Sequence, residues 1–472
     1  MAETIIGRER EMKTLRECVD SDRAEFVAVY GRRRIGKTFL VKHFFGEQFD
    51  FYTSGMYEGS RRDQIAVFHK QLNKHADGAY PMPATWFEAF DQLEHYIRRL
   101  DKQRVIIFID ELPWMDAPRS KFLQALELFW NMYASTRAGL KLIVCGSATT
   151  WMMSKLIGNK GGLYNRLTRT LRLEPFTLRE TEAYLVSKGI DWPRQLIVDC
   201  YMAIGGVPYY LSLLKPGLSV AQNIDELLFA NDAPLRTEYR FLFRSLFNDA
   251  AAYRNVVETL ARKTRGMTRA ELQQALALND GGMLTTILEN LCDCDFLRRY
   301  NAFGKKERDA LFQLCDLYTL FYIRFVKGTS PDPYRWATMI DNPQRRSWSG
   351  YAFEQVCFAH TQQLKQALGI SGILTNVCSW NGHTDEGQAQ IDMLIDRRDQ
   401  TVNICEMKYS TAPFELTGDY YQLIINRQEL FRSVTGTKKA LVPVIITPHG
   451  LKHNRYAQAI TRVLTLDDLF CM

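Results

Sequence analysis

The chain has 472 residues, of which 46% are hydrophobic and 24% charged, and its formal net charge is +7. It is too long for one ordinary hydrophobic core, and the length is that of about three domains. The positive charge permits binding to a polyanion without establishing it. No apolar run approaches the ~20 residues of a membrane span, and the first residues do not form a signal peptide. The cysteines include no C-x-x-C pair, which argues against a zinc site or a disulfide framework. We therefore expect a cytoplasmic protein without a membrane partner.

The first predicted element is an amphipathic helix that follows the charged segment Ile6-Gly7-Arg8. Apolar side chains recur at helical spacing along it, at Met12, Leu15, Cys18 and Val19. On their own, these residues indicate only a helix with a charged start.

The next two elements are a strand that ends at Gly31 and a helix that begins near Lys37, joined by a basic loop. The spacing from Gly31 to Thr38 is G-x-x-x-x-G-K-T, the phosphate-binding P-loop pattern, and it occurs in the strand–loop–helix context that the pattern requires. Backbone amides of such a loop, together with the helix N-terminus, favour phosphate oxygens. A glycine-rich turn without a ligand would not need the Lys-Thr pair or the helix. We expect the following residues to bind ATP: Gly31, Arg32, Arg33, Arg34, Ile35, Gly36, Lys37, Thr38 and Phe39.

A second signal for phosphate chemistry is the apolar run from Val105 to Ile109, which ends in Asp110 and Glu111. An unbroken run of this kind predicts a strand buried on both faces of a parallel sheet, with its carboxylates at the ligand-binding edge. We expect Thr38 and Asp110 to hold Mg²⁺ and Lys37 to reach the β- and γ-phosphates. Glu111 would then orient or deprotonate the attacking water.

Another buried strand, from Lys141 to Gly146, ends at Ser147. Two interpretations of Ser147 remain open. Its hydroxyl would contact the γ-phosphate or position the water, or it would cap the helix that follows.

Together, these motifs resemble the archaeal-type and signal-transducing branches of the AAA+ ATPases. The resemblance implies that Ile6, Gly7 and Arg8 cover the adenine and that Pro208, in Gly206-Val207-Pro208, approaches the base. It also implies that Arg166 acts as an arginine finger, which requires a homo-oligomer. Here Asn165 stands where the family has glycine in the segment Leu163-Tyr164-Asn165-Arg166, and an exposed structural arginine is the competing interpretation.

The middle of the chain changes pattern. Residues 172–235 read as a helical lid after an ATPase core of residues 1–171. Residues 236–328 show three helices and a hairpin, the order of a winged helix, with Thr268 and Glu271 forming a capping box. Acidic residues on the third helix favour protein contacts, whereas basic residues near the hairpin favour phosphate contacts, so both remain open; the basic residues are Arg298, Arg299, Lys305, Lys306 and Arg308. The proline-punctuated residues 329–349 are predicted to be a linker.

The C-terminal residues 350–472 carry acidic residues on a predicted helix and two predicted strands. Asp392 lies on one strand, and the next strand ends in Glu406-Met407-Lys408. Residues two apart in a strand share a face, so Glu406 and Lys408 point the same way. The arrangement resembles the PD-(D/E)-x-K nucleases, which implies that Asp392 and Glu406 bind Mg²⁺, that Lys408 acts on the attacked phosphate, and that Glu354 completes the site.

The whole order resembles an archaeal-type ATPase family with a C-terminal domain of unknown function. The resemblance implies an α/β fold: a P-loop AAA+-type parallel sheet with a helical lid, a winged-helix domain and a C-terminal restriction-endonuclease-like α/β domain. We expect an ATP-hydrolysing enzyme with a Mg²⁺-dependent nuclease-like domain that acts on nucleic acid, DNA being favoured. The alternative is a nucleotide-switched regulator or scaffold whose C-terminal fold binds nucleic acid or protein without cleavage.

Overall fold

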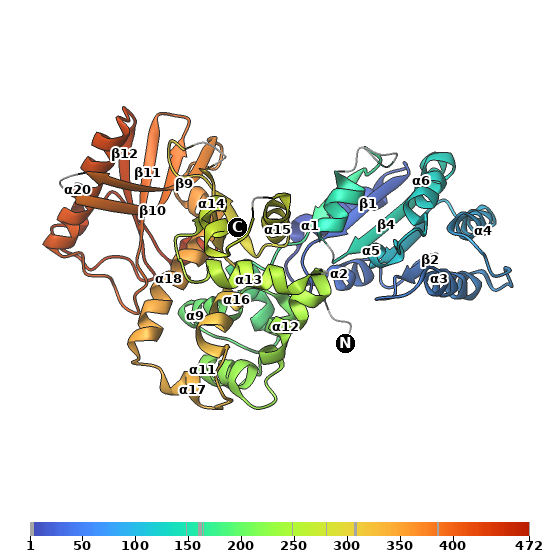
Figure 1. Cartoon of the computed structure of the whole chain (residues 1–472), viewed down its shortest axis with the longest axis horizontal. Helices are drawn as coiled ribbons and strands as arrows, with labels where there is room; N and C mark the ends of the chain where they lie inside the picture. The colour runs from blue at the N-terminus through green and yellow to red at the C-terminus, as the bar shows by residue number, and fades with distance from the viewer. Residues whose placement is uncertain are drawn as a thin grey trace. The chain divides into compact units, whose positions relative to one another are not determined.

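The computed structural model describes residues 4–471 except 148, 159–162, 164, 248, 280, 306–308 and 385–386. The chain divides into two compact units, Met1–Glu174 and Pro175–Met472, which are described separately below (Figure 1). Within the described residues, no helix is both long and apolar enough to cross a bilayer.

The first unit is built on a sheet of five parallel strands in the order β2-β3-β4-β1-β5. The strands are β1 (Glu25–Tyr30), β2 (Phe51–Ser54), β3 (Val105–Asp110), β4 (Leu140–Gly146) and β5 (Arg169–Arg172). All residues of β1 are buried, and they alternate between two cores: Phe26 and Ala28 face one, whereas Val27 and Val29 face the other. β3, the strand predicted to be buried on both faces of a parallel sheet, likewise contributes Ile107 to the first core and Phe108 to the second, which confirms that prediction. Because the strands are parallel, their carboxyl ends lie at one edge of the sheet.

Helices cover this sheet. They are α1 (Glu9–Asp20), α2 (Lys37–Phe44), α3 (Arg61–Ala76), α4 (Trp86–Arg98), α5 (Leu112–Met115), α6 (Phe122–Met132) and α7 (Thr149–Trp151). Helix α4 begins at the Thr85 cap, whose side chain accepts a hydrogen bond from the amide of Glu88. The ring of Trp86, on α4, packs edge-on against Phe68 and Phe122, on α3 and α6. The aromatic repeat of α4 therefore serves the core.

The second unit begins with helices and a small antiparallel sheet of order β6-β8-β7. The helices are α8 (Leu178–Ser187), α9 (Arg194–Ile204), α10 (Pro208–Ser212), α11 (Val220–Ile224), α12 (Pro234–Leu246), α13 (Ala250–Leu260), α14 (Arg269–Ala275) and α15 (Gly282–Asp293). The strands are β6 (Met267–Thr268), β7 (Leu297–Tyr300) and β8 (Leu311–Leu314). The predicted capping box at the start of α14 is present, with Thr268 and Glu271 exchanging hydrogen bonds.

The predicted linker, residues 329–349, is packed instead. It contains α17 (Arg335–Thr338) and the start of α18 (Pro343–Ala359), and it follows α16 (Leu317–Phe321). Trp336 and Trp348 are buried against Phe321 and Phe325. The carboxylate of Asp225 accepts hydrogen bonds from the amides of residues 336 and 337, at 2.6 and 3.0 Å. The prolines and polar residues suggested a linker, but the buried tryptophans hold this segment in the core.

The C-terminal part of the second unit is a mixed sheet of order β13-β12-β11-β10-β9. Its strands are β9 (Thr375–Thr384), β10 (Gly387–Arg397), β11 (Thr401–Met407), β12 (Ala440–Ile446) and β13 (Arg462–Leu464). The pairs β9–β10 and β10–β11 are antiparallel, and β11–β12 and β12–β13 are parallel. The remaining helices are α19 (Thr361–Ala367), α20 (Gly418–Thr435) and α21 (Leu466–Leu469).

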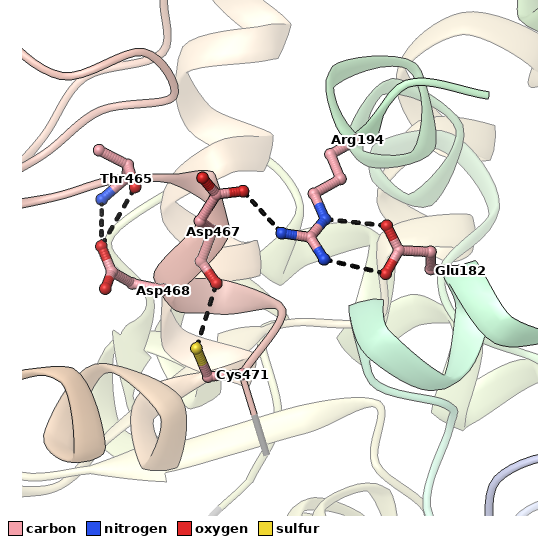
Figure 2. Close-up of polar contacts among 6 residues, drawn as sticks. All are labelled: Glu182, Arg194, Thr465, Asp467, Asp468 and Cys471. Carbon is pink, nitrogen blue, oxygen red and sulfur yellow. Dashed lines mark hydrogen bonds and ion pairs between the residues drawn. The ribbon is translucent and has the colours of Figure 1, made fainter.

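Polar contacts tie this C-terminal sheet to the helices that begin the second unit. Figure 2 shows Arg194 on α9 between Glu182 and Asp467, with nitrogen–oxygen distances of 2.8 Å and 2.6 Å. The hydroxyl of Tyr409, which follows Lys408, donates to the carboxylate of Asp199 on α9. The residue beside the predicted E-x-K site is therefore anchored to a helix of the predicted lid.

His360 forms a further, pH-dependent connection within the second unit, between α18 and the start of α8. Its Nδ1 donates to the carbonyl of Val356, and its Nε2 accepts from the amide of Leu178 at 2.9 Å. Burial lowers the pKa of His360 to about 4, and the neutral ring fits both bonds.

We expect acid to weaken this tie. Between its ordinary pKa of 6.5 and about 4, the unfolded chain binds a proton that the folded chain excludes. Stability is therefore fully present above pH ~6.5 and falls as the pH drops toward ~4, by up to about 3 kcal/mol. The urea unfolding midpoint should therefore fall more between neutral and mildly acidic pH in wild type than in His360→Gln. The glutamine amide oxygen can accept the hydrogen bond from Leu178, but the amide does not titrate. Equal acid sensitivity of the two proteins would contradict this assignment.

Candidate active sites

The loop from Gly31 to Gly36 has a backbone with positive φ at both of its end glycines, and a larger residue is excluded at Gly31. Gly31 has φ +143°, and a Cβ there would lie 2.3 Å from the carbonyl oxygen of Leu173. Gly36 has φ +85° and immediately precedes α2. The loop consequently turns sharply from β1 into the N-terminus of α2, the geometry expected of a phosphate-binding loop.

Lys37 closes this loop from the first turn of α2. Its Nζ donates to the carbonyl oxygens of Gly31 at 2.9 Å and Arg32 at 2.8 Å. The side chain is only 6% exposed. These contacts hold an ammonium group against the backbone that is predicted to bind phosphate.

The two residues predicted to hold Mg²⁺ lie together although they are 72 positions apart. The hydroxyl of Thr38 donates to the carboxylate of Asp110, at 2.9 Å to Oδ2 and 3.2 Å to Oδ1. A hydroxyl and a carboxylate are oxygen ligands of the kind that Mg²⁺ prefers. The pair therefore fits the predicted metal role.

Glu111 and Ser147 also meet at this edge of the sheet. The hydroxyl of Ser147 donates to Oε2 of Glu111 at 2.9 Å, and the amide of Ser147 donates to the same oxygen at 3.2 Å. Glu111 has φ +44°, in the left-handed region, where it precedes α5. Ser147 is thus placed to orient the predicted catalytic carboxylate, an arrangement that the spacing along the chain did not reveal. Its role as a sensor of the γ-phosphate stays a prediction.

Two further residues near Asp110 were not predicted from the sequence. Burial, and then the charge of Asp110, raise the pKa of the Cys145 thiol on β4 well above its usual value. The same two causes raise the pKa of Tyr52 on β2. Both side chains therefore stay protonated beside Asp110, and their position next to β3 in the sheet is the signal that could have identified them.

The opening segment reaches the loop through Arg8. Its guanidinium donates to the carbonyl oxygen of Ile35 at 3.2 Å and lies 3.7 Å from Glu11. The roles of Ile6, Gly7 and Arg8 at the adenine stay predictions. Arg166 is exposed, and Tyr164 of the same segment lies outside the described residues. Pro208 begins α10, in the second unit.

A family model matches the part of the chain that contains this site. Residues 5–214 match the model of a family described as an ATPase domain predominantly from Archaea. This chain is an ATP-hydrolysing P-loop enzyme. An uncharacterized protein of Methanocaldococcus jannaschii is 28% identical over 323 residues, 68% of each chain. A Walker-type ATPase of Pyrococcus abyssi is 16% identical with a TM-score of 0.48, covering 68% of this chain and 96% of that one. The ORC2 protein of Aeropyrum pernix, solved in ADPNP and ADP complexes, is 13% identical with a TM-score of 0.41, covering 68% and 94%.

The acidic residues predicted to form the nuclease-like site lie beyond the part of the chain that matches the ATPase family. Glu354 comes from α18, Asp392 from β10 and Glu406 from β11. The pairing of β10 with β9 is irregular between Ile391 and Leu394, where Asp392 lies. Nζ of Lys408 lies 3.0 Å from Oε1 of Glu406, so these two side chains share a face as predicted.

The charges of these residues act on one another. Burial, followed by the charges of Asp392 and Glu406, raises the pKa of Glu354 to about 8, while Lys408 opposes the shift. The four predicted side chains are therefore close enough for the charges of Asp392, Glu406 and Lys408 to act on Glu354.

Glu406 has partners that the sequence analysis missed. Tyr420 donates to its Oε1, and Arg427 donates to its Oε2 at 2.7 Å, both from α20. Burial raises the pKa of Glu406, but Lys408, Arg427 and Tyr420 outweigh it and the net shift is downward. Tyr420 and Arg427 lie seven residues apart, two helical turns, and this spacing on the helix after the E-x-K strand is the signal that could have found them.

The predicted metal pair is accordingly not a preformed centre. In the part of the chain that the structure describes, no three His, Cys, Asp or Glu side chains are grouped so as to hold a metal ion. The carboxylate of Asp392 accepts a hydrogen bond from Gln390 at 2.6 Å. The carboxylate of Glu406 forms ion pairs with Lys408 and Arg427. The two carboxylates fit a hard cation by their chemistry, but Glu406 would have to exchange a present partner for it.

The hairpin β7–β8 contacts the C-terminal sheet, which corrects one expectation. Ala302 pairs with Ser379 of β9, and the ring of Phe303 packs on Phe431 with centroids 4.9 Å apart. Arg298, expected to contact phosphate, lies over the ring of Phe358 at 3.7 Å and donates to Gln355 at 2.9 Å. It is held inside the second unit because its planar cation stacks well on an aromatic ring. Lys306 and Arg308 lie outside the described residues.

Proposed function

We propose that this ATPase carries in its second unit a Mg²⁺-dependent nuclease site that acts on nucleic acid, with DNA as the favoured substrate. The observation that carries the proposal is the convergence of Glu354 on α18, Asp392 on β10, Glu406 near the end of β11 and Lys408 directly after it. These elements come from a mixed sheet flanked by helices, which supports a restriction-endonuclease-like fold. The helices and hairpin between α13 and β8 support a winged-helix domain.

In this proposal the side chains have separate roles. Asp392 and Glu406 would hold Mg²⁺, with Glu354 completing the site; the ion would neutralise phosphate charge and favour ionisation of water. Lys408 would place its ammonium group beside the attacked phosphate and offset the charge that develops there. Arg427 and Tyr420 hold Glu406 in place and keep it ionised.

A second candidate function is favoured by one observation. Both oxygens of Glu406 are already bound by Lys408, Tyr420 and Arg427, and the described residues contain no formed metal cluster. A carboxylate whose oxygens already have these partners is not available to a metal ion unless one partner leaves. This favours a domain that binds nucleic acid or protein without cutting it, in a nucleotide-switched regulator or scaffold.

A cleavage assay separates the two. Labelled single-stranded and duplex DNA and RNA are incubated with the full chain and Mg²⁺ or Mn²⁺, with and without ATP, and with excess EDTA as the control. The nuclease proposal expects fragments that EDTA abolishes. If the substrates stay intact in every arm, and light scattering shows that the particle size of the protein changes when nucleotide is added, the regulator or scaffold function is favoured.

For ATP hydrolysis, we propose that Glu111 activates the water and that Thr38 and Asp110 hold Mg²⁺, which screens the phosphate charge. Glu111→Gln should retain ATP binding and lower turnover by ~10²-fold or more, because the amide keeps the shape but loses the base. Steady-state phosphate release and binding of a fluorescent ATP analogue measure the two quantities. Glu94→Gln, which alters a surface ion pair with Arg98 on α4, is the control. Unchanged turnover in Glu111→Gln would show that another group orients the water.

We propose that Arg166 acts on ATP bound by a neighbouring copy in a homo-oligomer, as its exposure allows. Arg166→Ala and Glu111→Gln should each be inactive alone, and mixing them should restore turnover at interfaces that combine one intact Arg166 with one intact Glu111. The measurement is phosphate release against mixing ratio. If mass measurements show that mixed oligomers form but phosphate release does not rise above that of the two inactive variants, Arg166 acts on the ATP of its own subunit or has a structural role.

A further inference from the structure

A cavity of about 480 Å³ lies between the hairpin segment and the C-terminal sheet of the second unit. Its lining includes Asp392 and Glu354, and from the other side Arg265, Tyr300 and Lys305. Asp392 and Glu354 of the proposed nuclease site therefore line this cavity, and other lining residues come from the segment that follows α13.

The walls are fixed to one another. The amide of Phe303 donates to the carbonyl oxygen of Ser379 at 2.8 Å, next to the Ala302–Ser379 pairing. The hydroxyl of Tyr300 donates to the carbonyl oxygen of Arg265 at 2.6 Å, which holds the loop after α13 against β7. The cavity is thus a built feature of the second unit.

The lining carries charges of both signs. Lys263 is held by Glu271, with Nζ and Oε1 2.6 Å apart. Arg265 and Lys305 are exposed, and among the described residues neither side chain has a hydrogen bond or ion pair. Of the other lining acids, Asp309 and Glu271 lie on the same side as these cations, whereas Asp392 and Glu354 lie on the C-terminal domain. Arg265 and Lys305 thus come from the hairpin side of the cavity, and the acidic residues Asp392 and Glu354 come from the C-terminal part of the unit.

We propose that this cavity binds an unpaired nucleic-acid strand, with Arg265 and Lys305 contacting its backbone phosphates beside Asp392. This inference rests on the proposed nuclease function and names its substrate class. A volume of about 480 Å³ lies in the ~300–1,000 Å³ range of sites for nucleotide-sized ligands, and it does not admit a base-paired helix. Tyr300, which is only partly buried, offers a ring to a base, and cations beside an aromatic side chain are the usual means of binding single strands.

Binding is tested separately from cleavage by working in EDTA. Fluorescence anisotropy of a short labelled DNA strand is measured with the full chain, and matching RNA and duplex DNA serve as competitors. Arg265→Ala/Lys305→Ala should raise Kd by ~10-fold or more and reduce the slope of log K against log salt by about 1.4, since each lost phosphate contact accounts for ~0.7.

The matched control is Arg262→Ala/Lys438→Ala, which removes the same charge from two exposed positions outside the cavity lining. Its Kd should stay within about twofold of wild type. Equal losses in both double variants, or a duplex that competes as well as the single strand, would overturn the inference. If strands bind as expected but are never cut with Mg²⁺, only the nuclease proposal fails. If strands are cut while the Arg265→Ala/Lys305→Ala protein binds normally, only this inference fails.

Discussion

Replacing Lys37 by alanine should weaken ATP binding by ~10²-fold or more and abolish hydrolysis. The ammonium group of Lys37 is held against the carbonyl oxygens of Gly31 and Arg32, within the loop that turns β1 into α2. It is the side-chain cation that the motif places at the β- and γ-phosphates, and a charge-assisted contact of about 3 kcal/mol corresponds to this loss of affinity. Binding of a fluorescent ATP analogue and phosphate release measure the two effects.

A matched lysine variant controls for fold and net charge. Lys70→Ala removes an exposed lysine from α3 in the same unit and should leave affinity and turnover within about twofold of wild type. Thermal unfolding of both variants shows whether the loop change has disturbed the sheet. Tight ATP binding by a folded Lys37→Ala protein would contradict the assignment of the loop.

Replacing Asp392 by asparagine should abolish Mg²⁺-dependent cleavage of nucleic acid and leave ATP hydrolysis unchanged. The substitution keeps the size of the side chain and removes the negative charge that the proposal assigns to the metal. ATP hydrolysis survives because Thr38, Asp110 and Glu111 belong to the first unit and Asp392 to the second. Both activities are measured on the same preparation.

Lys408→Ala and Asp399→Asn complete this series. Lys408→Ala should lose mainly cleavage rate while still binding metal, because its ammonium group acts on the phosphate. Asp399→Asn alters an exposed carboxylate that pairs with Arg397 at the turn after β10 and should cleave normally. Cleavage by Asp392→Asn at the wild-type rate would rule out its role, whereas loss of cleavage in Asp399→Asn would indicate a general effect of charge.

The ATPase site was predictable because its signals are local. The turn from β1 into α2 has positive φ at Gly31 and Gly36, and adjacent carboxylates stand at the end of β3 and just after it, so spacing alone located both motifs. Parallel strands bring such ends to one edge of the sheet, which is why Thr38 and Asp110 meet. The contact between Ser147 and Glu111 was not predictable, because it depends on side-chain directions at the ends of β3 and β4.

The C-terminal site was predictable only in part. The period of two in a strand placed Glu406 and Lys408 together. The spacing of Tyr420 and Arg427 puts both on one face of α20, but it does not show that this face would meet Glu406. Similarly, the basic residues near the hairpin favoured phosphate contacts, whereas Arg298 stacks on Phe358. Tertiary packing decides both outcomes, as it does for the buried tryptophans of the expected linker.

The most direct test of the nuclease account is to locate the ion. Crystals of the full chain with Mn²⁺, which gives an anomalous signal in X-ray diffraction, should show a peak between Asp392 and Glu406 at ~2.0–2.6 Å from their oxygens, with Arg427 displaced from one oxygen of Glu406. Crystals of Asp392→Asn should lack that peak. A peak only at Thr38 and Asp110, with Glu406 still bound by Lys408 and Arg427, would contradict the account and leave a domain that binds without cutting.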